Sequence, residues 1–136
     1  MGRNWSGDDV TTLPNGAGYG YTRKALAMII NELEDLFDTL IILGHVKAKD
    51  VEKNGEEMTV RGLDLTGKSA SILCSQVDAV GYMYRDDEDN TVINFASSES
   101  LQVGSRSEHL KGKKIIVAKN DQDGNLTVDW SGIFKK

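Results

Sequence analysis

The sequence is poor in cysteine, histidine and long apolar runs, and each shortage excludes a class of protein. Cys74 is the only cysteine in 136 residues, so no disulfide can form within the chain, and a reducing compartment is expected. The two histidines, His45 and His109, are far apart and have no cysteine beside them, so no zinc ligand set is visible. No run approaches the roughly 18 apolar residues of a membrane span. We therefore expect a cytoplasmic protein without a membrane segment.

The charge balance excludes a surface that is basic throughout. The chain has 16 Lys and Arg against 21 Asp and Glu, and its formal net charge is −5. Any contact with nucleic acid must therefore use a local basic patch. The length of 136 residues and the apolar content of 39% fit one domain with one core.

A helix is predicted after an irregular start. Residues 1–21 include the only proline and several glycines, and we expect them to form a glycine-rich lead-in. From Leu26 to Leu40 the apolar residues recur at steps of three and four, which predicts a helix over about 22–38 with Thr22 as its N-cap.

The next apolar run indicates the fold class. Leu40–Leu43 is unbroken and leads into Gly44 and His45, which predicts a central strand covered on both faces. With a second strand at 79–84 in the same sheet, this predicts an α/β fold with parallel central strands and helices. An unpaired apolar strand edge at Leu40–Leu43 would favour self-association.

The rest of the chain is predicted to be a charged loop, a short helix and antiparallel hairpins. Residues 47–58 are highly charged and predict either a mobile loop or a ragged hairpin, in both cases poorly ordered, and residues 69–77 predict a helix. The predicted hairpin strands are 91–95, 114–118 and 126–130, the last two joined by a turn near Asp123 and Gly124.

One stretch satisfies the spacing G-x-x-x-x-G-K-[ST] of a phosphate-binding loop. A working loop wraps its N–H groups closely around phosphates, whereas this one has two leucines and Asp64 inside it, and Asp64 would repel an anion. The preceding residues 56–61 are also too polar for a buried strand. We interpret the match as chance or as a structural turn. Its formal residues are Gly62, Gly67, Lys68 and Ser69.

Two further features have a structural and a functional interpretation. Gly16, Gly18 and Gly20 precede the predicted helix, where free N–H groups can hold an anion, but they also suit a flexible lead-in. The acidic run 86–89 has ligands for a hard cation, but it also suits a solvated turn, which we prefer.

In order, the strand ending at His45, the charged loop, the turn 63–68, the helix and the stretch 77–85 resemble the C-terminal half of the RecA/DnaB-type ATPase core. They are similar in particular to phage ATP-binding proteins of the AAA and RecA recombination type. The resemblance covers about residues 16–130. In that family the phosphate loop and the catalytic acids lie upstream of these motifs, and we expect residues 22–136 to be the C-terminal part of such a domain, either of a longer protein or of a reduced homologue without hydrolysis.

The resemblance also implies roles for particular residues. His45 matches a polar sensor of the γ-phosphate, with a strand-end histidine that binds no ligand as the alternative. Arg85 and Arg106 are candidates for reaching a nucleotide in a neighbouring subunit, with surface salt bridges as the alternative. A DNA-facing loop follows the sensor strand, and a plain solvated loop is its alternative. The basic residues there are Lys47, Lys49, Lys53 and Arg61.

The resemblance thus implies the C-terminal portion of a phage-type ATPase that acts in DNA recombination or replication in a bacterial host cell. The complete protein would use ATP and Mg²⁺, form a homo-oligomer and contact single-stranded DNA, while this chain alone would neither hydrolyse ATP nor bind it tightly. The alternative is a stand-alone, non-catalytic module that binds DNA or protein.

Overall fold

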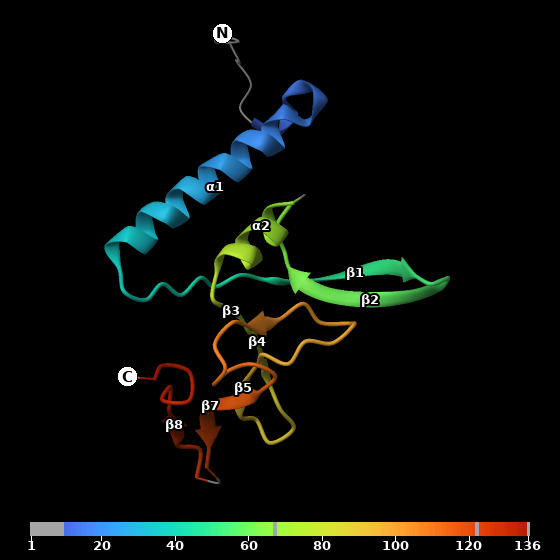
Figure 1. Cartoon of the computed structure of the whole chain (residues 1–136). Helices are drawn as coiled ribbons and strands as arrows, with labels where there is room; N and C mark the ends of the chain where they lie inside the picture. Colours follow the sequence, from blue (N-terminus) through green and yellow to red (C-terminus); the bar gives the residue numbers. More distant parts are fainter. Residues whose placement is uncertain (1–9, 67, 122, 136) are drawn as a thin grey trace. The chain divides into compact units, whose positions relative to one another are not determined.

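The computed structural model describes residues 10–66, 68–121 and 123–135 (Figure 1). The chain divides into two compact units. The helical unit comprises Met1–His45 and Leu63–Ser75, and the sheet unit comprises Val46–Gly62 and Gln76–Lys136. No helix among the described residues is long and apolar enough to cross a membrane.

The helical unit begins with helix α1. Two short 3-10 turns, η1 (Val10–Thr12) and η2 (Pro14–Gly16), lead into α1 (Ala17–Leu36). Thr22 lies inside α1 and donates its Oγ1 hydrogen to the carbonyl oxygen of Gly18 at 3.0 Å, so it is not the predicted N-cap. The helix therefore starts earlier than expected, and the last part of the expected lead-in is helical.

The segment after α1 is not a strand. Phe37 ends the helix in an extended conformation (φ −134°, ψ 137°), and the chain stays irregular up to His45. Leu40–Leu43 pairs with no other strand, and the Leu43 side chain is 85% exposed. The predicted central strand is therefore wrong. The apolar run indicated only that these residues favour burial, and the described residues include no strand that pairs with it.

The charged stretch is a hairpin, the second of its two predicted forms, and it is regular rather than poorly ordered. Strand β1 (Val46–Lys53) pairs with β2 (Glu56–Leu63) in a two-stranded sheet (Figure 1). The connecting residues Asn54 and Gly55 both have positive φ, 56° and 82°. Asn-Gly is the pair that a type I′ turn prefers, because its twist matches that of two antiparallel strands.

Helix α2 (Ser69–Gln76) follows β2 and confirms the predicted short helix. The expected strand at 79–84 is divided at Gly81 into β3 (Ala79–Val80), which pairs with β6 (Gly104–Ser105), and β4 (Tyr82–Arg85). A Cβ at Gly81 would lie 2.5 Å from Cγ2 of Ile93, so glycine allows the backbone to approach the core.

The main sheet has the order β4-β5-β7-β8 and is antiparallel throughout. Its remaining strands agree with the predicted hairpins: β5 (Thr91–Asn94), β7 (Lys114–Asn120) and β8 (Leu126–Val128). The core of the sheet unit consists of Ile93, Phe95, Leu110 and Val117. Cross-strand partners such as Ile93 and Ile115 bring these apolar side chains to one face of the sheet.

The fold class differs from the prediction. All strand pairs within the described residues are antiparallel, and two α-helices accompany them. The chain is thus mixed α/β, and the predicted RecA-like sheet with parallel central strands is wrong. The error came from Leu40–Leu43, because an unbroken apolar run is typical of a buried parallel strand but does not require one.

Candidate functional site

The β1–β2 hairpin separates its charges between its two faces. Side chains alternate along a strand, so Lys47, Lys49 and Lys53 of β1 share one face. The Thr59 hydroxyl donates a hydrogen bond to Asp50 across the hairpin at 2.7 Å, which puts these two side chains together on the other face. We call the first surface the lysine face.

The opposite surface is acidic. Asp50 and Glu52 of β1 lie on it, and so do Glu57 and Arg61, which have the same parity as Thr59 in β2. The hairpin has four basic and four acidic side chains, and its net charge is zero. The alternation nevertheless gives each face three charges of one sign and one of the other, because Glu56 is the single acid on the lysine face. This separation cannot be seen in the net charge of the segment.

The loop 96–102 is attached to the hairpin. Arg61 donates its N–H to the carbonyl of Ser100 (2.8 Å) and accepts at its own carbonyl from the N–H of Gln102 (3.0 Å). The Lys53 ammonium donates to Glu99 at 2.9 Å, and this contact holds the pKa of the Glu99 carboxyl below its ordinary value. The side chains of this ion pair are more than half exposed, so the pair is solvated.

The formal phosphate-loop match lies at the β2–α2 connection. A strand, a loop and a helix follow one another in the order that a phosphate loop requires. The strand, however, belongs to a two-stranded antiparallel hairpin, and Gly62 lies within it. Gly67 lies outside the described residues, Lys68 is exposed and Ser69 is buried.

The backbone of this connection is already occupied by hydrogen bonds within the protein. The N–H of Asp64 donates to the His45 carbonyl at 2.8 Å, that of Leu65 to Leu63 at 3.0 Å and that of Ser69 to Thr66 at 3.2 Å. A phosphate cradle needs such donors free and convergent. The described residues of the match therefore do not fit a nucleotide triphosphate.

His45, the predicted sensor, is close to the same connection only through its main chain. Its carbonyl accepts the Asp64 N–H, and a Cβ at the preceding Gly44 would overlap the end of the Leu63 side chain unless that side chain shifted. The His45 side chain is exposed and lies at the start of β1, not at the end of a central strand. His45 therefore does not end a strand, which was the feature that suggested a sensor, and the sensor role stays a prediction.

The two candidate trans arginines both form surface ion pairs. Arg85 Nη1 lies 2.7 Å from Asp89 Oδ1, and this contact raises the pKa of the arginine. Arg106 Nη1 lies 3.9 Å from Asp78 Oδ1, and its N–H donates to the Asp78 carbonyl. Both arginines are exposed, and these pairs fit the salt-bridge alternative. A role toward a nucleotide of another subunit stays a prediction.

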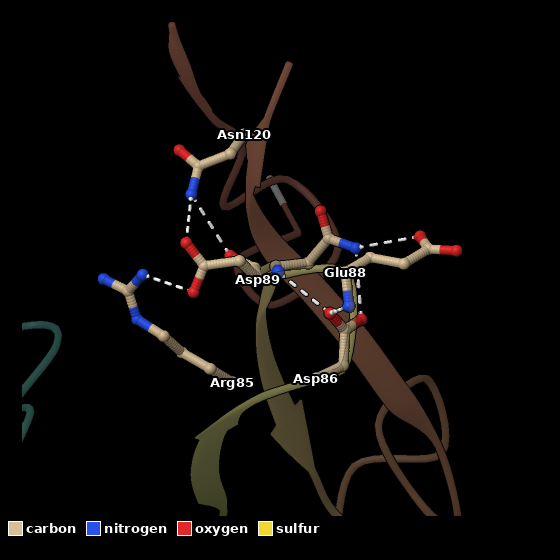
Figure 2. Close-up of polar contacts among 6 residues, drawn as sticks. Arg85, Asp86, Glu88, Asp89 and Asn120 are labelled. Atoms are coloured by element: carbon tan, nitrogen blue, oxygen red, sulfur yellow. Dashed lines mark hydrogen bonds and ion pairs between the residues drawn. The ribbon is translucent and has the colours of Figure 1, made fainter. Parts of the chain in front are cut away.

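Figure 2 shows that the acidic turn 86–90 forms a connected polar network. Asp86 accepts hydrogen bonds from the N–H groups of Glu88 and Asn90 at 3.0 and 2.8 Å, and from the Asn90 side chain at 3.1 Å. Asn120 donates to the Asp89 carboxylate at 2.9 Å, which ties the turn to the end of β7. The contacts with Asn90 and Arg85 lower the pKa of Asp86 and of Asp89, respectively.

This network is structural by its contacts. The Asp86 carboxylate accepts hydrogen bonds from the turn itself, as in an Asx-turn, whereas that of Asp89 accepts from Arg85 and Asn120 outside the turn. Within the described part of the chain, no group of three or more His, Cys, Asp or Glu side chains is placed to hold a metal ion. Gly16, the first of the glycines considered for an anion, has φ 68° and forms the bend into α1. Burial raises the pKa of the Cys74 thiol, which favours its neutral form.

The sequence reasoning found the basic residues but missed how they are divided. It grouped Arg61 with the three lysines, whereas the hairpin puts it on the opposite face. The signal that was available is Asn54-Gly55, the strongest short-range indicator of a two-residue hairpin turn. With that turn recognised, alternation along β1 and β2 gives both faces.

Comparison with known proteins identifies the family. A family model described as an AAA domain matches residues 4–121. The chain therefore belongs to this family of P-loop nucleoside triphosphatases, and it is an AAA-family ATPase domain, a class that binds nucleotide. Searches of the curated proteins and of the solved structures gave no match.

Proposed function

We propose that this AAA-family domain contacts single-stranded DNA through the lysine face of the β1–β2 hairpin. The observation that supports the proposal is the charge separation within the hairpin, which puts Lys47, Lys49 and Lys53 on one face with Glu56 as the only acid of β1 and β2 there. Lys53 is in addition paired with Glu99 of the loop 96–102. Lys47 and Lys49 are spaced about 7 Å apart along the strand, and Lys49 and Lys53 about 13 Å. Such a row can follow a phosphate backbone, and the counterions that it releases supply the binding energy.

The setting of this contact is DNA recombination or replication of the phage type, in a bacterial host cell. The chain acts there as the C-terminal portion of the ATPase, in a homo-oligomer. ATP and Mg²⁺ belong to the complete protein. The stretch 62–69 is not the nucleotide site of this proposal, because its donors at Asp64, Leu65 and Ser69 are used within the protein.

The DNA contact is tested with a labelled single-stranded oligonucleotide and fluorescence anisotropy. Lys49→Gln should weaken binding by about threefold to tenfold, because it removes one phosphate contact. The matched control is Arg61→Gln, which removes a positive charge from the same hairpin but from its acidic face. Equal weakening by both variants would contradict the proposal, because it would mean that only net charge matters.

A second candidate function is a non-catalytic module that binds DNA or protein. It is favoured by the same engaged N–H groups, which leave no phosphate cradle among the described residues of the 62–69 match. ATP turnover by the chain alone should equal the buffer blank, and Lys68→Ala should not change it. Turnover that disappears in Lys68→Ala would contradict both candidates and restore the phosphate loop.

A further inference from the structure

Helix α1 is apolar on two neighbouring faces. One face is turned inward: Ile30 is 4% exposed, and Leu26 and Leu33 beside it are half-buried. The other face is exposed although it is apolar, and we call it the outer stripe. It consists of Tyr21, Ala25, Met28, Ile29 and Leu36.

The outer stripe is wide, and Glu32 interrupts it. From Tyr21 to Ile29 its residues follow the helical steps of three and four, Glu32 takes the next position before Leu36, and the stripe spans about 100° of the helix circumference. Met28 is 64% exposed and Leu36 is 71% exposed. A helix that is apolar on both faces is normally buried on both, and an exposed apolar patch of this kind usually marks an interaction surface.

The charges of α1 are separated along its length. Arg23 and Lys24 lie in the N-terminal half, and Glu32, Glu34 and Asp35 lie in the C-terminal half. This order opposes the helix dipole, which favours acids at the start and bases at the end. The first turn contains no acid and the last turn no base. This order of charges therefore destabilises an isolated helix, and opposite charges from outside the helix would offset the effect.

The charges of α1 cannot compensate one another. The closest opposite pair, Lys24 and Glu32, is separated by about 12 Å along the helix, whereas ion pairs within a helix need a spacing of three or four residues. None of these charged side chains forms an ion pair within the described part of the chain.

We infer that the outer stripe is the contact surface for a second copy of this chain, with the two α1 helices antiparallel. In that orientation the basic half of each helix lies along the acidic half of the other. Lys24 and Asp35 flank the stripe on the same side, and positions on the same side face each other across the two-fold axis of such a pair. The contact therefore occurs twice and offsets the unfavourable order of charges in both helices.

Charge reversal tests the pairing in the full chain, by sedimentation velocity over a range of concentrations. Wild type should approach twice its mass of 14.9 kDa. Lys24→Glu and Asp35→Lys should each raise the dimer dissociation constant by about tenfold or more, because each puts like charges together twice. The double variant, and an equimolar mixture of the two single variants, should both recover association within about threefold of wild type.

The recovery of association distinguishes an antiparallel pair from a parallel one. In a parallel pair residue 24 of one helix and residue 35 of the other would be about 16 Å apart along the axis, so the double variant would stay impaired. Lys24→Glu also gives the helix a more favourable order of charges with respect to its dipole. If the substitution acted only on helix stability, it would therefore stabilise the protein and would not weaken association. A double variant that stays impaired, or a wild type that is monomeric at every concentration because another segment covers the stripe, would overturn the inference.

A second pair of variants tests the contribution of the apolar residues to association. Met28→Glu, within the outer stripe, should abolish association. Leu126→Glu, in β8 of the sheet unit, makes the same kind of change at a residue of nearly equal exposure, 62% against 64%, and should leave the dissociation constant within about twofold. Circular dichroism of the monomers checks that both variants are folded. Equal loss in both variants would assign association to general surface hydrophobicity and overturn the inference.

Discussion

The two units of the chain use apolar residues in opposite ways. In the sheet unit, Ile93, Phe95, Leu110 and Val117 come from separate segments and form one core in which each is at most 8% exposed. In the helical unit, Ile30 and Leu73 are the fully buried large apolar side chains among the described residues, while Met28 and Leu43 are largely exposed. The difference lies in the availability of partners. Antiparallel pairing brings the apolar side chains of the sheet unit together, whereas α1 and the segment after it have more apolar surface than their own unit buries.

This contrast assigns different tasks to the two units. Residues that fill a closed core hold the sheet unit together, so changing them should lower stability. Exposed apolar residues that contact nothing within the chain contribute little to its stability, so changing them should alter association instead. The predictions below test this division in order of decreasing effect.

Truncation of the core should have the largest effect. Phe95→Ala removes a ring that is 5% exposed and should lower the free energy of unfolding by about 3–5 kcal/mol. Leu43→Ser, at an 85% exposed position of the helical unit, should change it by no more than about 0.5 kcal/mol. Denaturant unfolding measures both values. Comparable losses in the two variants would mean that Leu43 is buried in solution and that the contrast is wrong.

Overpacking of the core should have an intermediate effect. A Cβ at Gly81 would lie 2.5 Å from Ile93 and 2.9 Å from the Phe95 ring, so Gly81→Ala should cost about 1–3 kcal/mol. Gly104→Ala is the matched control, because a Cβ there would have no atom within 4 Å and should cost less than about 0.5 kcal/mol. Thermal unfolding of the pair gives the difference, and a neutral Gly81→Ala would refute the close approach.

The polar turn of the sheet unit should have the smallest effect, and this effect depends on pH. Arg85 holds the folded-state pKa of Asp89 below its unfolded value of 3.8. The contribution of Asp89 to stability is therefore present above pH 3.8 and is lost as the pH falls through the lower folded value. Asp89→Asn, which tolerates the φ of 60° at this position, should be less stable than wild type at neutral pH, with a difference that shrinks at acid pH.

The control for this turn is Asp87→Asn, at the exposed residue that follows Asp86, which should leave stability at neutral pH unchanged. A constant difference between Asp89→Asn and wild type from neutral to acid pH would show that the ion pair with Arg85 is not its source.

The hairpins of the sheet unit could be predicted from sequence, and the reason is local. Strands near Thr91, Lys114 and Leu126 are bounded by turn residues, and Gly124, with φ 81°, has the positive φ that such a turn uses. Their pairing is between neighbours along the chain or nearly so. A short-range pattern therefore contains most of the information that fixes these elements.

The helical unit could not be predicted equally well, because its burial depends on contacts that the local pattern does not contain. Leu40–Leu43 has the composition of a buried strand but lacks a partner, and no periodicity reports that. The start of α1 was missed because Gly18 and Gly20 are poor helix formers, although both lie in its first turns. The candidate interface could be predicted only in part from the sequence. The lysines were identified, but the face that they share depends on the Asn54-Gly55 turn.

The salt dependence of DNA binding tests the central claim about the lysine face most directly. The affinity for a single-stranded oligonucleotide should fall with salt, and the slope of its logarithm against the logarithm of salt concentration counts phosphate contacts. Replacing Lys47, Lys49 and Lys53 together with glutamine should reduce the magnitude of that slope by about 2, at about 0.7 for each contact, while Arg61→Gln leaves it unchanged. An unchanged slope in the triple variant, or an equal change in Arg61→Gln, would contradict the assignment of DNA binding to this face.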